Sequence, residues 1–173
     1  MGKWHMLTIV GEDRPGIVAG VTEALFEGGC NLGETSMIRI GGNFTIMMMA
    51  DYAGSPESLK AMLKPVAESL SLRVHVDLIE GKLHSHVEPD VVVTLSGADK
   101  AGIVAKAAGA LFEAGLNILH LESDVAGTDD KPIYIMHIEG VAQKGVGPLR
   151  SALDGILKEG VEASIKPIDT LYA

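Results

Sequence analysis

The chain has 173 residues, of which 47% are hydrophobic, and it carries 23 acidic and 14 basic side chains, for a formal net charge of −9. This composition excludes a disordered chain, and the lack of a Lys and Arg cluster argues against direct binding to nucleic acid. No apolar run approaches the roughly 20 residues of a membrane helix, the start lacks a signal-peptide pattern, and the one cysteine, Cys30, excludes an internal disulfide. We therefore expect a globular cytoplasmic protein that contacts neither nucleic acid nor a membrane.

The first half of the chain has the patterns of four strands and two helices. Helix 1 is predicted from Pro15 to Gly28, because proline suits a first helical turn and glycine a helix stop. Helix 2 is predicted to start at Ser55-Pro56-Glu57, with Ser55 as its cap. A hairpin turn is predicted at Gly41-Gly42-Asn43, since these residues accept the positive φ of tight hairpins. Alternating or apolar segments predict strands at residues 4–10, 31–40, 44–50 and 73–78.

The second half repeats the first at a spacing of 86 residues. Gly11-Glu-Asp-Arg-Pro-Gly-Ile-Val-Ala19 matches Gly97-Ala-Asp-Lys-Ala-Gly-Ile-Val-Ala105. After the hairpin, Met47 matches Met136 at an offset of 89, which predicts three extra residues in the turn at 127–131. The repeat predicts the same order of elements: strand 90–96, helix 101–114, strands 117–126 and 133–139, helix 146–159 and strand 161–168.

This order, strand–helix–strand–strand–helix–strand, indicates an α+β protein with two ferredoxin-like units in tandem. We expect a first domain at 1–80, a linker at 81–89 and a second domain at 90–173. Right-handed crossovers place the first and third strands of each unit in the centre of its sheet. Helices cover one face only, so apolar residues on the other face predict a further layer, from the other unit or from another subunit.

The turn before the first helix of each unit is the candidate binding site. Its glycines leave backbone N–H groups uncovered at the helix start, where the helix dipole favours a carboxylate. Asp13 and Asp99 lie in the same turns and can accept hydrogen bonds from an ammonium group, so each turn suits an amino acid. The alternative is purely structural: the aspartates cap the helices, the glycines permit the turns, and Asn31 and Asn117 occupy left-handed turn positions.

Asp13-Arg-Pro-Gly-Ile17 followed by Gly29-Cys-Asn-Leu32, within this order of elements, resembles the ACT domain, a family of small regulatory modules of amino-acid metabolism. The resemblance covers both units and is closer in the first. In the family, amino-acid effectors bind at the turn after the first strand and at the end of the first helix, often between two modules. The resemblance therefore implies two sets of ligand-binding residues: Gly11, Asp13, Gly16, Ile17 and Asn31 in the first unit, and Asp99, Gly102, Ile103 and Asn117 in the second.

Two such modules without an attached enzyme imply a sensor. It would bind a small amino acid, glycine or similar, and act through a protein partner, for which a DNA-binding regulator of amino-acid metabolism is one candidate. A ligand that bridges two modules would stabilise one mutual arrangement, and we expect a homo-oligomer. The alternative is a regulatory or assembly subunit of an amino-acid metabolic enzyme that does not sense a ligand.

The sequence contains no pattern for catalysis, a cofactor or a metal. Neither repeat has Gly-x-Gly-x-x-Gly or a P-loop lysine, and no catalytic triad or carboxylate pair is recognisable. His84-Ser-His86 lies in the predicted linker without a further metal ligand in the sequence. Cys30 is matched by Leu116, which predicts a buried thiol. We therefore expect a protein that is not an enzyme and holds neither a cofactor nor a metal.

Overall fold

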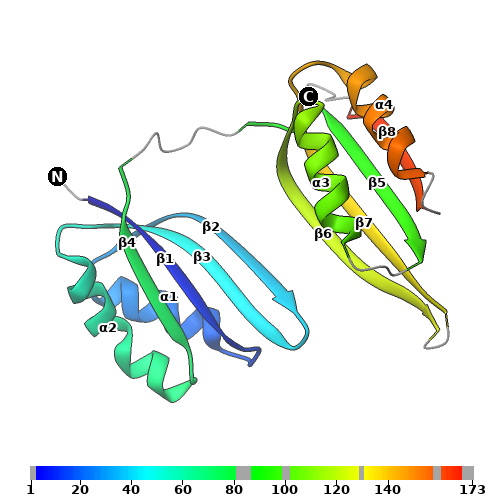
Figure 1. Ribbon diagram of the computed structural model, residues 1–173. Coiled ribbons are helices and arrows are strands. Elements are labelled where there is room, and N and C mark those ends of the chain that lie inside the picture. Colours follow the sequence, from blue (N-terminus) through cyan, green and yellow to red (C-terminus); the bar gives the residue numbers. More distant parts are fainter. Residues whose placement is uncertain (1–2, 81–86, 99–101, 129–130, 158–160, 169–173) are drawn as a thin grey trace. The chain divides into compact units, whose positions relative to one another are not determined.

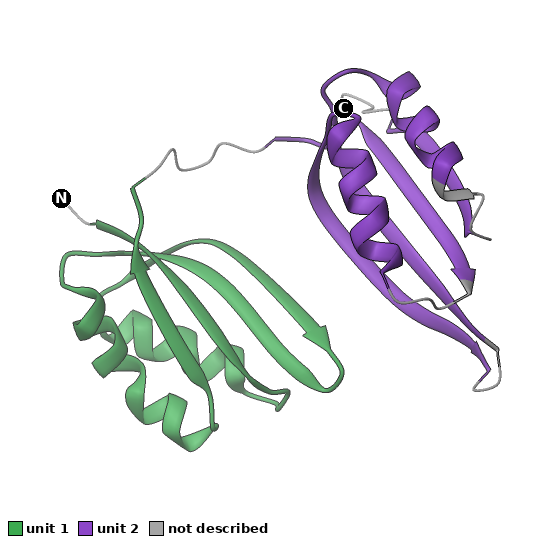
Figure 2. Cartoon of the chain, in the orientation of Figure 1, with its two compact units in different colours: residues 1–85 green, residues 86–173 purple. Residues whose placement is uncertain are grey.

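The computed structural model describes residues 3–80, 87–98, 102–128, 131–157 and 161–168. The chain divides into two compact units, residues 1–85 and 86–173 (Figure 2). Each unit has the order strand, helix, strand, strand, helix, strand (Figure 1), which confirms the α+β class and the two ferredoxin-like units. Most of the predicted linker lies outside the described residues, so the domain boundaries stay a prediction.

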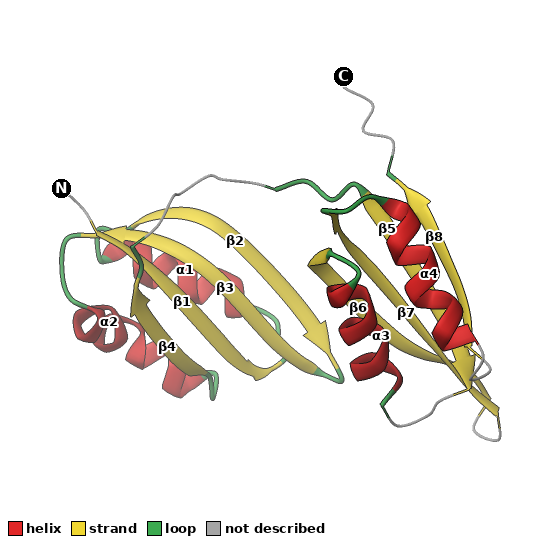
Figure 3. Ribbon diagram, turned by 45° about the horizontal axis from the view of Figure 1, so that its top comes forward, coloured by secondary structure: helices red, strands yellow, loops and turns green. Residues whose placement is uncertain are grey.

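The first unit is a four-stranded antiparallel sheet with both helices on one face (Figure 3). The sheet order is β2-β3-β1-β4, which confirms that the first and third strands are central. Its elements are β1 (Lys3–Glu12), α1 (Ile17–Glu27), β2 (Asn31–Ile40), β3 (Asn43–Tyr52), α2 (Pro56–Ser69) and β4 (Arg73–Leu78).

Local signals explain the boundaries of these elements. Gly41 and Gly42 have φ of 56° and 74°, so the predicted hairpin turn between β2 and β3 is confirmed. Ser55 caps α2 as predicted, with its hydroxyl accepting a hydrogen bond from the Ser58 N–H at 3.3 Å. Helix α1, however, begins two residues later than Pro15. Gly16 is its N-cap with φ of 89°, a left-handed conformation that no residue within a right-handed helix adopts.

The second unit repeats this architecture with the sheet order β6-β7-β5-β8. Helix α3 also begins after a glycine, Gly102, with φ of 89°. The elements of the second unit are β5 (Val91–Ala98), α3 (Ile103–Glu113), β6 (Leu116–Thr128), β7 (Lys131–Ala142), α4 (Val146–Leu157) and β8 (Val161–Pro167).

The β6–β7 hairpin is longer than the β2–β3 hairpin because its strands are longer. Leu7 pairs with Met48 in the first unit, and the equivalent Val93 pairs with Ile138, which sets the offset at 90. The predicted offset of 89 is therefore wrong. Thr128 pairs with Lys131 just as Ile40 pairs with Asn43, so the extra residues extend the two strands and not the turn. An alignment that matches Met47 with Met136 is therefore wrong by one residue. A shift of one residue places a side chain on the opposite face of its strand.

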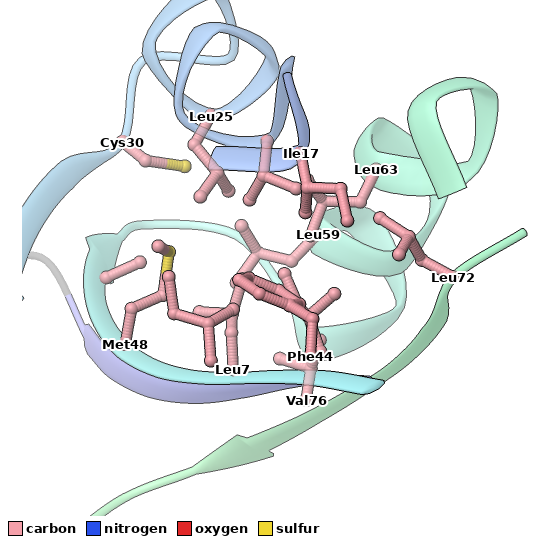
Figure 4. Close-up of a cluster of buried hydrophobic side chains, with 14 residues drawn as sticks. Leu7, Ile17, Leu25, Cys30, Phe44, Met48, Leu59, Leu63, Leu72 and Val76 are labelled. Carbon is pink, nitrogen blue, oxygen red and sulfur yellow. The ribbon is translucent and has the colours of Figure 1, made fainter. Parts of the chain in front are cut away.

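Each unit has its own hydrophobic core between its helices and its sheet. In the first, Leu7, Leu25 and Leu59 are fully buried (Figure 4). In the second, Val93, Leu111, Met136, Ile138 and Leu149 are fully buried, among other residues. No helix among the described residues is long and apolar enough to cross a membrane.

The opposite face of the first sheet exposes several apolar side chains. Met47, Ile38 and Ile40 are 47%, 53% and 74% exposed. Their register partners, Thr8, Thr45 and Asn43, place them on the face away from the core. The further layer predicted to cover this face stays a prediction.

Candidate functional site

A pocket of about 660 Å³ lies where β1 turns into α1. Three of the residues predicted from the sequence, Asp13, Gly16 and Ile17, line it together. The other lining residues come from the same turn, from the first turn of α1, and from β2 and β3: Arg14, Pro15, Val18, Ala19, Met37, Arg39 and Phe44.

The start of α1 supplies hydrogen-bond donors to this pocket. The first N–H that bonds within the helix is that of Gly20, which donates to the Gly16 carbonyl oxygen at 2.9 Å. The N-cap has no side-chain hydrogen bond from the described residues. A helix N-terminus without a side-chain cap presents backbone N–H groups and the positive end of the helix dipole. The prediction that Asp13 merely caps this helix is therefore wrong.

Four charged side chains at the turn form two opposite-sign pairs. Arg39 forms a salt bridge with Asp13, and Arg14 forms one with Glu12 at 2.6 Å. The pKa of the Glu12 carboxyl lies below its ordinary value, because Arg14 donates a hydrogen bond to it and adds positive charge nearby. Three of these four side chains are largely exposed, so solvent screening keeps the contribution of each pair to stability small. Their net charge is zero.

These groups suit a ligand that carries both charges. A carboxylate can accept hydrogen bonds from the helix N-terminus and from Arg39, while Asp13 can accept one from an ammonium group. Ile17, Val18, Met37 and Phe44 line the pocket with apolar surface. A small amino acid combines all three requirements.

Two residues predicted for this site do not line the pocket. Gly11 packs against Leu72, whose Cδ2 would lie 2.7 Å from a Cβ added at Gly11. Asn31 begins β2, while Met37 and Arg39 line the pocket near the other end of that strand. Six residues of strand separate Asn31 from Met37, a distance of about 20 Å. The structure thus brings Asp13, Gly16 and Ile17 together, but not Gly11 or Asn31.

Asn31 and Asn117 do not occupy left-handed turn positions, and that alternative is wrong. The positive φ falls on the preceding glycines, Gly29 and Gly115, at 75° and 95°. Among the described residues, Ser71 alone combines a positive φ with a side chain. Asn31 and Asn117 are instead exposed strand residues near the ends of α1 and α3.

The predicted site residues did not include seven residues that line the pocket, and three of these are distant in sequence: Met37, Arg39 and Phe44. The feature of the sequence that could have indicated these three residues is the register of the β2–β3 hairpin. A two-residue turn at Gly41-Gly42 pairs Arg39 with Phe44 and Met37 with Ile46. Paired residues share a face of the sheet, so all three lie on the helix-covered face beside α1.

The second unit repeats the left-handed glycine of this site but has other side chains on its strands. Gly102 has the φ of Gly16, Ile103 is buried and Asn117 is exposed, whereas Asp99 lies outside the described residues. Gly11 pairs with Phe44 and Gly97 pairs with Tyr134, so Tyr134 corresponds to Phe44. Val125 pairs with Tyr134 as Arg39 pairs with Phe44. Valine therefore stands where the first unit has Arg39.

Comparison with known proteins identifies the fold family. The model of the ACT domain family matches residues 5–77. The UPF0237 protein YjhC of Lactococcus lactis is 40% identical over 72 residues, which span 41% of this chain and 83% of that protein. The chain belongs to the ACT domain family.

Two further relatives extend over both ACT units. The glycine cleavage system transcriptional repressor of Escherichia coli is 25% identical over 136 residues, 78% of this chain and 71% of that protein. A crystal structure of an unknown protein from Galdieria sulphuraria has a TM-score of 0.76 at 20% identity and covers 97% of this chain and 99% of its own. The chain is thus similar in sequence to the E. coli repressor over 78% of its length and in fold to the Galdieria protein over 97% of it.

The described part of this ACT protein offers no grouping of three or more His, Cys, Asp or Glu side chains that could hold a metal ion. The motif His84-Ser-His86 lies outside the described residues. Cys30 is buried, as predicted, and its Sγ lies 4.0 Å from the Met62 Sδ.

Proposed function

We propose that this ACT protein is an amino-acid-sensing regulator whose pocket at Asp13, Gly16 and Ile17 binds glycine or another small amino acid. The observation that carries the proposal is the neutral arrangement of charges at the uncapped start of α1. Asp13 and Arg39 form one ion pair and Glu12 and Arg14 another. A zwitterion adds no net charge there, whereas a simple anion or cation would unbalance the site.

In the proposed complex the ligand carboxylate lies against the start of α1 and the guanidinium of Arg39. The ammonium group takes one oxygen of Asp13, whose side chain is 25% exposed. A short side chain packs on Met37 and Phe44. The pocket has room for more than glycine, so the larger aliphatic amino acids belong in the same test.

Asn31 can contact the proposed ligand only if a second ACT module lies beside the pocket. One copy of the unit places Asn31 about 20 Å along β2 from the pocket, a span that no small amino acid covers. A ligand that contacts both Asp13 and an asparagine of this kind must lie between two modules. Ligand binding would then stabilise the paired arrangement by its higher affinity for it.

We further propose that a protein partner binds differently to the ligand-free and the ligand-bound forms of this site. The net charge of −9 disfavours direct contact with DNA. The printed name of the E. coli relative describes a transcriptional repressor. A DNA-binding regulator of amino-acid metabolism is therefore the partner class that we propose, and the protein itself acts without catalysis.

The test is calorimetric titration of the full chain with glycine, serine, alanine and leucine. We expect saturable heat for at least one of them, and an affinity at least tenfold lower in Arg39→Val, which installs the residue of the second unit. That loss corresponds to about 1.4 kcal/mol, within the range of a hydrogen bond to a charged group. The matched control is Arg73→Val, an exposed arginine on β4, the other edge strand, and it should leave the affinity unchanged.

Absence of heat and of any melting shift with all four amino acids would overturn the sensor. The remaining role would then be assembly with an enzyme of amino-acid metabolism. In that case, the double variant Asp13→Ala/Asn31→Ala would keep its partner and its oligomeric state whether or not amino acids are present.

A further inference from the structure

A second pocket, of about 330 Å³, lies at the opposite end of β1 from Asp13. It is formed where β3 leads into α2, beside the start of β1 and the end of β4. Its lining residues are Lys3, His5, Ala53, Gly54, Ser55, Pro56 and Leu78. Eight residues of extended chain separate His5 from Asp13, about 26 Å, so the two pockets are distinct.

The wall of this pocket contains a buried histidine without a hydrogen-bond partner. His5 is 0% exposed, and neither its Nδ1 nor its Nε2 bonds to any described residue. The ring of Tyr52 lies beside it, with the two ring centroids 6.3 Å apart. Buried polar groups are nearly always hydrogen-bonded, because an unpaired one loses its hydration without compensation. An imidazole always carries at least one N–H, so His5 offers a donor to an occupant of the pocket.

The second unit shows that the fold does not need a histidine here. His5 pairs with Ala50 and Leu78, and Val91 pairs with Gly140 and Pro167 at the same place in the second sheet. Val91 is 1% exposed, so an aliphatic side chain fills this position fully. A purely structural residue would be expected to be apolar in both copies.

The loop beside His5 is constrained. A Cβ added at Gly54 would clash with the ring of Tyr52, so the ring packs directly on the loop backbone. Ser55 is held by its bond to the Ser58 N–H. The pocket wall is therefore built by packing and capping.

The charges around the pocket select the ligand. Lys3 supplies an ammonium group at the wall. The start of α2 already has an anion, because Glu57 lies in its first turn. The pKa of that carboxyl is lowered by hydrogen bonds that it accepts from its own backbone N–H and from Ser55. The Glu57 carboxylate repels a dianion such as hydrogen phosphate more strongly than it repels a single negative charge, which Lys3 and His5 can hold. Ala53, Pro56 and Leu78 add apolar surface.

We infer that this pocket binds a short aliphatic monocarboxylate, with its carboxylate on the His5 N–H and the Lys3 ammonium and its tail against Pro56 and Leu78. The site does not depend on the proposed amino-acid site at Asp13. It is specific to the first unit, since the second unit has Val91 in place of His5.

The test is an NMR titration of the full chain with sodium propionate, balanced with sodium chloride to constant ionic strength. We expect saturable shifts of the His5 ring resonances and of the backbone amides at 53, 54 and 57. In His5→Val, which installs the residue of the second unit, the amide shifts should require at least tenfold more propionate. That variant should melt no lower than the wild type, because it removes two unpaired polar atoms from a buried position.

Three controls separate the possible outcomes. Propionamide has the same size without the charge and should not saturate the site, and inorganic phosphate should bind more weakly than propionate. Arg39→Val, which alters the site at Asp13, should leave propionate binding unchanged. No saturable shift, equal binding by His5→Val, or stronger binding of phosphate would each overturn the inference.

Discussion

At the scale of single residues, the two ACT units hold different side chains at equivalent backbone positions. Arg39 pairs with Phe44 in the first unit, and Val125 pairs with Tyr134 at the same place in the second. On the first strand of each unit, His5 corresponds to Val91. In both cases the polar residue is in the first unit. A valine at each place in the second unit shows that the fold tolerates an apolar residue. The fold therefore does not require either polar residue, and we propose that each of them serves in binding.

Cys30 provides a residue-scale prediction about reactivity. Burial raises the pKa of its thiol, because it disfavours the charged thiolate. The thiolate is the reactive form, so we expect Ellman's reagent to label Cys30 at pH 8 at least tenfold more slowly in the native protein than in the urea-unfolded chain. Equal rates would contradict the burial of this thiol.

The raised pKa of Cys30 also makes the free energy of unfolding depend on pH. The thiol loses its proton at a lower pH in the unfolded chain than in the folded protein, so its contribution to the free energy of unfolding is full at neutral pH and declines as the pH rises above the unfolded pKa. Comparison with Cys30→Ala isolates this contribution from other alkaline titrations.

At the scale of elements, the start of the first helix is the most closely repeated feature. Gly16 and Gly102 both have φ of 89°, and no side chain of the described residues caps α1 or α3. Glycine is required there because a Cβ is disfavoured in the left-handed region. The uncapped helix start is thus built into both units by a glycine, while the charged residues around it differ.

This geometry predicts how much stability is lost when alanine replaces either glycine. A Cβ at Gly16 or Gly102 would meet no atom of the described residues within 4 Å, so we expect a conformational penalty alone. We expect Gly16→Ala and Gly102→Ala each to lower the free energy of unfolding by about 1–2 kcal/mol, measured by urea denaturation.

The matched control is Gly109→Ala. Gly109 lies inside α3, and a Cβ there would also meet no atom within 4 Å. Because alanine is the better helix former, this variant should raise the free energy of unfolding by up to about 1 kcal/mol. A loss of stability of the same size in all three variants would contradict the conformational explanation.

At the scale of the whole molecule, the described chain contains two separate hydrophobic cores. Leu59 in α2 and Leu149 in α4 are both 0% exposed, each within the core of its own unit. Each unit therefore has the means to unfold cooperatively by itself.

Trp4 makes this testable, because it is the one tryptophan of the chain and lies in β1 of the first unit. Leu59→Ala should lower the free energy of the transition followed by Trp4 fluorescence by about 2–5 kcal/mol. Leu149→Ala should leave that transition in place and shift only the remaining part of the circular dichroism signal. One common transition, shifted equally by both variants, would show that the units unfold together.

The sequence by itself determined the element order, the duplication, the central strands and the family, because these depend on local periodicity, on turn residues such as Gly41 and Gly42, and on a motif repeated 86 residues apart. It also placed Asp13, Gly16 and Ile17 in one turn. Only the tertiary structure brought Arg39 to Asp13, separated Asn31 from both, and showed the unpaired His5. Strand register and burial decide these contacts, and both arise from residues distant in sequence, where a shift of one residue reverses the face of every side chain.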